Sequence, residues 1–161
     1  MRPSQSIFAL VVSATLGVGG AEAQERLPTT GPYYLMGVTD QAVTFVAGGT
    51  VTKSGDHASV TVIAGSSRDK FIATGFGRVD MLYEFNCPRG LMRTPLLMGY
   101  SPDDLRMAAH EDPGDWQAIT PNTPASRAMA FACEGTVAPG SELPDTIDAV
   151  IQMYQLHLDG Q

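Results

Sequence analysis

The stretch that decides the fold runs from Val79 to Cys87 and reads Val79-Asp80-Met81-Leu82-Tyr83-Glu84-Phe85-Asn86-Cys87. Apolar side chains occupy its odd-numbered positions, whereas its even-numbered positions are polar with the exception of Leu82. Alternation with a period of two is typical of a β-strand that buries one face. We therefore predict a strand that places Cys87 on the core side of a sheet.

Further strands are predicted on both sides of this one. The candidates are residues 43–51, interrupted by Gly48-Gly49, residues 58–64, which alternate, and residues 91–100 and 105–109. Pro95 predicts an edge or a bulge, because proline has no N–H to donate to a strand ladder. Residues 65–70 are predicted to be a polar loop, and the whole of residues 71–87 is expected to be extended. The total is about five to six strands.

Two helices are predicted after the strands, which makes the fold class α+β. Thr123 is a good N-cap with Pro124 at the first helical position, and the helix formers that follow end at Gly135. A second helix is predicted within residues 141–159, with Pro144 in its first turn. Its apolar side chains recur at helical spacing, namely Ile147, Val150, Ile151, Tyr154 and Leu158. This stripe is expected to dock on the domain's own core, and a homodimer contact is the alternative.

The chain contains two cysteines, Cys87 and Cys133. In an oxidising compartment an even pair usually forms a disulfide, which here would join a predicted strand to a predicted helix. The alternative is a catalytic thiol, which needs a histidine and a third orienting group. The local sequence supplies neither group, so we predict the Cys87–Cys133 disulfide.

The amino terminus has the three parts of a secretory signal peptide. Arg2 precedes an apolar run over residues 7–18, and Ala21-Glu22-Ala23 has the small-x-small form of a cleavage site. The run is shorter than the roughly 20 residues that cross a bilayer. We therefore expect residues 1–23 to be removed between Ala23 and Gln24. No cysteine stands at the cleavage site, so we expect a soluble periplasmic or secreted protein without a lipid anchor or membrane span.

The remaining chain is expected to be one domain with a short leader. Residues 24–32 contain two prolines and a glycine and are predicted to be a flexible leader. Residues 33–161 are predicted to be a single globular domain, with the sheet and first helix in 33–135 and the carboxy-terminal helix in 141–159. The formal net charge is −7, which argues against nucleic acid as a partner because such binding depends on Lys and Arg.

No catalytic or cofactor signature stands out. The histidines form no HxxxH or HExxH pair, and Gly75-x-Gly77 is too short for a phosphate loop, so no cofactor is expected. The richest polar cluster comprises His110, Glu111, Asp112 and Asp115. Carboxylates of this kind bind hard cations, but Pro113-Gly114 marks the segment as a turn, and acidic turns are common. These four are therefore weak candidates for a metal site.

Trp116 is the single tryptophan of the chain. A lone tryptophan can anchor a ligand, but it more often fills a core where a sheet meets a helix. We expect Trp116 to belong to the core.

The order of these features resembles the surface-adhesin protein E family of bacterial envelope proteins over about residues 43–133. The segments that carry the resemblance are Val43-Thr44-Phe45-Val46, Lys53 to Val62, Phe85-Asn86-Cys87-Pro88-Arg89-Gly90-Leu91-Met92-Arg93, Trp116 to Thr123, and the helix that ends at Cys133. The resemblance implies an antiparallel sheet with a helix tethered to one face by the Cys87–Cys133 bond. It also implies a non-enzymatic module that binds a protein or peptide. The alternatives are a small periplasmic hydrolase or metal-dependent enzyme, and a self-associating structural protein.

Overall fold

The computed structural model of the protein describes residues 26–103, 105–143 and 146–159. The predicted signal peptide, its cleavage site at Ala23 and Gln24, and Pro144 lie outside the described residues. The elements are β1 (Tyr33–Val38), β2 (Ala42–Ser54), β3 (His57–Ser66), α1 (Arg68–Thr74), β4 (Arg78–Asn86), β5 (Leu91–Tyr100), β6 (Arg106–Glu111), β7 (Gln117–Ala118), α2 (Pro124–Glu134), β8 (Glu142–Leu143) and α3 (Ile147–Leu158).

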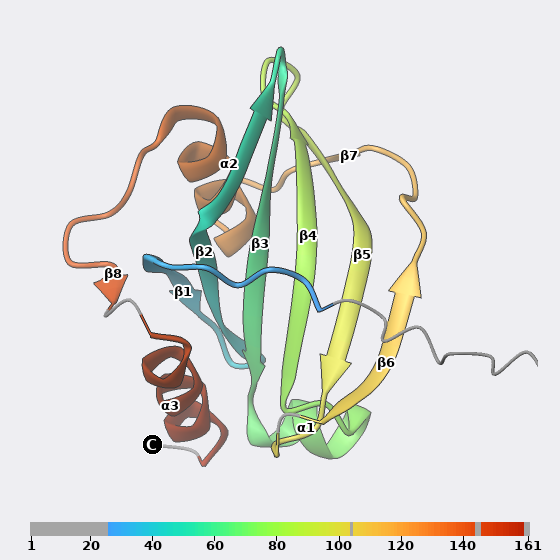
Figure 1. Cartoon of the computed structure of the whole chain (residues 1–161), viewed down its shortest axis with the longest axis vertical. Helices are drawn as coiled ribbons and strands as arrows, with labels where there is room; N and C mark the ends of the chain where they lie inside the picture. Colours follow the sequence, from blue (N-terminus) through green and yellow to red (C-terminus); the bar gives the residue numbers. More distant parts are fainter. Residues whose placement is uncertain (1–25, 104, 144–145, 160–161) are drawn as a thin grey trace, which may run out of the picture.

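The strands that the structure describes form one antiparallel sheet of eight, in the order β6-β5-β4-β3-β2-β1-β8, with β7 paired to β5 beside this path (Figure 1). The predicted α+β class and antiparallel sheet are confirmed. The strand number exceeds the five to six expected because β7 and β8 are bridges of only two residues each. Most strands follow their sequence neighbours because short turns join them, as between Ser54 and His57.

The two faces of the sheet carry different helices. Val62 and Ile63 are adjacent on β3 and therefore point to opposite faces. The Val62 side belongs to a core with Phe85 and buried residues of α2, whereas the Ile63 side belongs to a core with Val150 and other residues of α3. The odd-numbered residues of β4 pack on the α2 side, as their alternation predicts.

Cys87 and Cys133 form a disulfide that joins the end of β4 to the last turn of α2. The helix begins where predicted, because the Thr123 hydroxyl accepts a hydrogen bond from the Ser126 N–H and the Ser126 hydroxyl accepts one from the Thr123 N–H. This reciprocal capping satisfies backbone groups that the first turn leaves unpaired. Gly135 ends the helix in the left-handed conformation, with φ 77°. The predicted disulfide and stapled helix are confirmed.

One prediction about the middle of the chain is wrong. Residues 71–74, expected to be extended, belong to the short helix α1 together with part of the predicted loop. The Ser67 side chain caps its first turn by accepting from the Lys70 N–H, and Gly75 terminates it with φ 77°. The apolar residues of α1 are too few to show a helical period, so its capping residues are the local signal for where the helix begins and ends.

The amino-terminal segment of residues 26–32, which we term the strap, crosses the sheet face that carries α3 (Figure 1). It has no regular secondary structure, and it contacts the sheet. Leu27 is only 8% exposed and lies in a cluster with Met98 and Tyr100. The strap is therefore part of the described domain.

Two glycines of β2 hold the other end of the strap. The Gly48 N–H donates to the Pro32 carbonyl at 2.7 Å, and the Gly49 N–H donates to the Thr30 carbonyl at 2.9 Å. A Cβ atom on Gly49 would lie 2.5 Å from the carbonyl oxygen of Gly31. The Gly48-Gly49 interruption noted in the sequence thus marks a close approach of two backbones and a register shift in β2.

The carboxy-terminal helix α3 docks on the sheet as expected. Val150 and Tyr154 of its apolar stripe are buried. Gly65 of β3 is where the helix comes closest, because a Cβ there would lie 1.9 Å from the Tyr154 Cβ. The helix begins later than predicted, since Glu142 and Leu143 form β8 against β1. No helix in the described part of the chain is long and apolar enough to cross a membrane.

Candidate functional site

A row of polar side chains crosses four strands at the β2–β3 hairpin end of the sheet. Backbone pairing places Thr52 opposite Ser59, Ser59 opposite Glu84, and Glu84 opposite Arg93. Ser59 shares the face of Ile63, so the row lies on the face that the strap and α3 cover elsewhere. Residues directly opposite in antiparallel strands are close enough to interact, and the row forms the floor of an open pocket.

We call this hollow the Trp116 pocket; it is lined by Thr52, Ser54, His57, Ala58, Ser59, Glu84, Arg93 and Trp116 and has a volume of about 390 Å³. Pockets that hold a small ligand or a few residues of a peptide have volumes in this range. Its lining combines hydroxyl, carboxylate and guanidinium groups with the Trp116 ring. The pocket therefore offers both hydrogen bonds and an aromatic surface.

Arg93 is the central side chain of the pocket. Its Nε donates to Glu84 Oε2 at 2.6 Å, and both side chains are 31% exposed. Its guanidinium carbon lies 4.7 Å from the centroid of the Trp116 ring, which is within the range of a cation–π contact. The carboxylate and the ring together restrain the guanidinium, so it is presented to solvent in a defined orientation.

Two local structures position the remaining walls. The short β7 pairs with Leu91 and Met92 at the start of β5, so that the preceding Trp116 lies over Arg93. His57 is the first residue of β3 after the hairpin turn, where Gly55 has a φ of 58°. The imidazole centroid lies 5.5 Å from that of the indole, so the hairpin and the β6–β7 connection enclose the pocket from two sides.

The pocket contains hydrogen-bonding side chains beside the tryptophan ring. The Ser59 and Thr52 hydroxyls bond to each other at 2.7 Å. The His57 imidazole has a ring contact with Trp116 and no hydrogen bond to another side chain of the described residues. Donors and acceptors lie beside a half-buried aromatic ring, an arrangement that can bind a polar ligand.

The residues that the sequence nominated for a metal site lie at the surface of the described chain. The side chains of His110, Glu111, Asp112 and Asp115 are all exposed, the first two on β6 and the others in the loop before β7. Asp112 accepts the Gly114 N–H at 3.0 Å, as a turn residue does. Among the residues that the structure describes, no group of three or more His, Cys, Asp or Glu is arranged to hold a metal ion.

The prediction that Trp116 fills the core is wrong. It is half-buried, and it lies against Arg93 and His57 instead of between the sheet and α2. Sequence reasoning also missed Glu84 and Arg93 as site residues. Their opposite charges at facing positions of neighbouring strands were the available signal, but that signal is readable only once the register of β4 and β5 is known.

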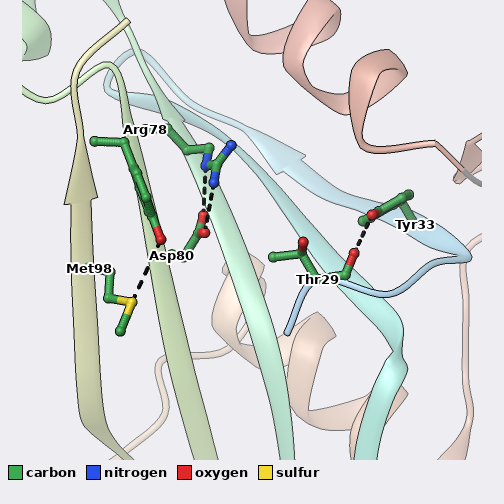
Figure 2. Close-up of polar contacts among 6 residues, drawn as sticks. Thr29, Tyr33, Arg78, Asp80 and Met98 are labelled. Carbon is green, nitrogen blue, oxygen red and sulfur yellow. Dashed lines mark hydrogen bonds and ion pairs between the residues drawn. The ribbon is translucent and has the colours of Figure 1, made fainter. Parts of the chain in front are cut away.

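A second polar cluster on the same face is enclosed by the protein. Arg78 Nε and Nη2 donate to the two carboxylate oxygens of Asp80 at 2.9 and 3.0 Å (Figure 2). The side chains are 3% and 1% exposed, and the guanidinium lies 4.3 Å from the Tyr100 ring centroid. The Tyr100 hydroxyl donates to Met98 Sδ at 3.6 Å. Because this pair is closed off from solvent, it serves the fold.

A smaller, more apolar pocket of about 230 Å³ lies beside α2; it is lined by Leu35, Met36, Arg127, Ala130, Thr136, Val137 and Ala138. Arg127 Nη1 donates to the Met36 carbonyl at 2.6 Å and so occupies an acceptor at this edge of β1. This pocket is smaller than the Trp116 pocket and has no aromatic side chain in its lining, so the Trp116 pocket is the better candidate site.

The fold and the pocket define a class of protein, an antiparallel α+β domain with a disulfide-linked helix and an open polar site on one sheet face. Comparison of the chain with protein-family models, with curated proteins and with solved structures gave no match.

Proposed function

We propose that the protein is an exported binding module of the cell envelope, which captures a peptide segment of a partner protein in the Trp116 pocket. The observation that carries this proposal is that the Arg93 side chain is restrained by its neighbours and still accessible from the pocket. Its side chain is held by Glu84 and Trp116, yet it faces an open pocket. Arginine and tryptophan are enriched among the residues that dominate protein interfaces, and restraint before binding lowers the entropic cost of association.

Two further observations support parts of the proposal. The amino-terminal sequence pattern favours export, and a disulfide such as Cys87–Cys133 is typical of proteins in oxidising compartments. The resemblance to the surface-adhesin protein E family favours a non-enzymatic binding role in the bacterial envelope. The Phe85 to Arg93 motif of that resemblance ends on the central residue of the pocket.

The test is affinity selection from a synthetic library of random hexapeptides, in which half of the members carry a free carboxyl terminus and half an amide. Peptides retained by the wild-type protein are identified by mass spectrometry and titrated by calorimetry against two variants. We expect Trp116→Ala to lower the affinity for the retained peptides at least about tenfold, because one good aromatic contact is lost. Arg89→Gln changes an exposed arginine in the β4–β5 turn and should leave the affinity unchanged.

Either of two results would contradict the proposal. The first is a selection in which wild type retains no peptide that the Trp116→Ala variant does not also retain. The second is equal affinity of the selected peptides for both variants and the wild type, because the binding would then lie elsewhere on the surface.

A further inference from the structure

The guanidinium of Arg93 has bonding capacity that the protein does not use. Its Nε is bonded to Glu84, whereas neither Nη1 nor Nη2 has a partner among the described residues. These two nitrogens carry four of the five N–H donors of an arginine side chain. The guanidinium is restrained by the Trp116 ring and is only partly exposed, so its remaining donors are fixed in direction and open to the pocket.

From this geometry we infer that the anchoring group of the peptide is its carboxy-terminal carboxylate, bound by the Nη donors of Arg93. Planar guanidinium groups bind carboxylates through two parallel hydrogen bonds, a geometry that a lysine cannot reproduce. This inference rests on the proposed peptide-binding function and names the part of the peptide that the pocket recognises. The His57 imidazole also lines the pocket, with its centroid 5.5 Å from that of the indole, and offers a ring N–H donor.

Glu84 makes a chain end a better match than an acidic side chain. One of its oxygens accepts from Arg93, and the other, Oε1, has no partner in the described chain. The pocket therefore presents two donors beside one acceptor. In a carboxy-terminal residue the carboxylate lies one carbon away from a backbone N–H, whereas in a glutamate side chain it lies two bonds farther. The chain end therefore holds the two complementary groups closest together.

Charge predicts how such a ligand binds. Glu84 offsets the charge of Arg93 locally, and the formal net charge of the chain is −7. Long-range attraction of an anion is therefore absent, and recognition depends on short hydrogen bonds inside the pocket. We expect weak binding of a minimal ligand, with a dissociation constant on the order of 1 mM, and little acceleration of association at low salt.

The experiment titrates wild-type protein with three peptides at constant ionic strength. They are acetyl-Ala-Ala-Ala with a free carboxyl terminus, its carboxy-terminal amide, and acetyl-Ala-Glu-Ala amide, which carries only a side-chain carboxylate. Fluorescence of Trp116 reports binding directly, because it is the only tryptophan of the chain and lines the pocket. We expect the free acid to bind at least about tenfold more tightly than either amide, as the loss of a charge-assisted bidentate contact implies.

Variants then assign the effect to Arg93. Arg93→Gln should abolish the preference for the free acid, Arg93→Lys should retain only part of it, and Arg89→Gln should retain all of it. Circular dichroism checks the fold of each variant. The comparison of the three peptides uses wild-type protein alone, so it remains decisive even if a variant fails to fold.

The outcomes separate this inference from the proposed function. If the amide binds as tightly as the free acid, or the glutamate peptide does, recognition of a chain end is refuted while peptide binding stands. If hexapeptides are selected but the free-acid tripeptide causes no change in fluorescence, the inference again fails alone. If neither library nor tripeptide binds, the proposed function fails and the inference fails with it.

Discussion

Replacement of Asp80 by asparagine tests whether the ion pair beneath the strap is as costly to break as its burial implies. The substitution keeps the size of the side chain and removes its charge, which leaves the Arg78 guanidinium without its carboxylate. Both side chains are almost fully buried, and two hydrogen bonds of 2.9 and 3.0 Å join them (Figure 2). Breaking a buried pair by removing one partner costs about 3–5 kcal/mol.

The assay is urea unfolding followed by circular dichroism, with the free energy of unfolding extrapolated to water. The matched control is Glu84→Gln, which breaks an ion pair on the same face between β4 and β5 at 31% exposure. We expect that control to cost at most about 1 kcal/mol, because solvent screens exposed pairs.

A double variant, Arg78→Met with Asp80→Leu, separates the cost of an unpaired charge from the value of the pair. Replacing both charges by apolar residues of similar volume is often neutral or stabilising. A methionine at position 78 can also keep a sulfur contact with the Tyr100 ring. The double variant should therefore recover most of the stability lost by Asp80→Asn. Equal losses for Asp80→Asn and Glu84→Gln, or a double variant no better than the single one, would refute this reasoning.

Two further predictions concern covalent linkage and pH. Replacing Cys87 and Cys133 by alanine opens a loop with a sequence separation of 46. The loop-entropy relation predicts that the free energy of unfolding falls by about 4 kcal/mol. A decrease below about 1 kcal/mol in urea unfolding would contradict this prediction. Burial, followed by the Asp80 carboxylate, raises the pKa of the Tyr100 phenol above its ordinary value of 10.0. The folded state then holds this proton more tightly than the unfolded state, so its contribution to stability is complete below pH 10.0 and declines as the pH rises further. Stability measured between about pH 9 and 11 should fall less steeply in Tyr100→Phe; an unchanged slope would argue against the assignment.

The elements predicted correctly from sequence are those with strong local signals. The strand that ends at Cys87 alternates without interruption on its apolar side, and α2 has a complete N-cap at Thr123 and a stop at Gly135. Pro95 predicted an edge or a bulge, and the β4–β5 register shifts between Leu82 and Glu84, opposite this proline. In each case the interactions that decide the structure lie within a few residues of one another.

The elements missed from sequence depend on tertiary contacts. The strap contains no periodic pattern, and its position follows from Leu27 packing against β5 and from backbone hydrogen bonds to Gly48 and Gly49. Asp80 was expected on the face opposite the α2 core, where it does lie, but its burial was not predicted. Its partner Arg78 lies against the Tyr100 ring, which packs with Leu27 of the strap, and local propensity cannot reveal such contacts.

The Trp116 pocket was missed for a similar reason, although all of its chemistry is present in the sequence. Glu84 and Arg93 are brought together by the pairing of β4 with β5, and Trp116 reaches them because the two-residue strand β7 returns to the start of β5. Each contact depends on which residues of two paired strands lie opposite each other, and the sequence alone does not specify this register. The lone tryptophan was assigned to the core because the sequence pattern does not show that a chain segment ends over an arginine.

Along the sheet face that carries the strap, the character of each side chain matches how far that part of the face is covered. Along β4, Asp80 is 1% exposed and is matched by a buried arginine, Leu82 contributes to the apolar cluster beneath the strap, and Glu84 is 31% exposed at the open end. A face that was simply solvated at this end would not need an aromatic side chain beside the ion pair. Trp116 instead excludes water from one side of Arg93 and leaves the other side accessible. A half-covered cation of this kind gains most when a ligand completes its surroundings, which is why the uncovered end of the sheet is the part of the molecule best suited to binding.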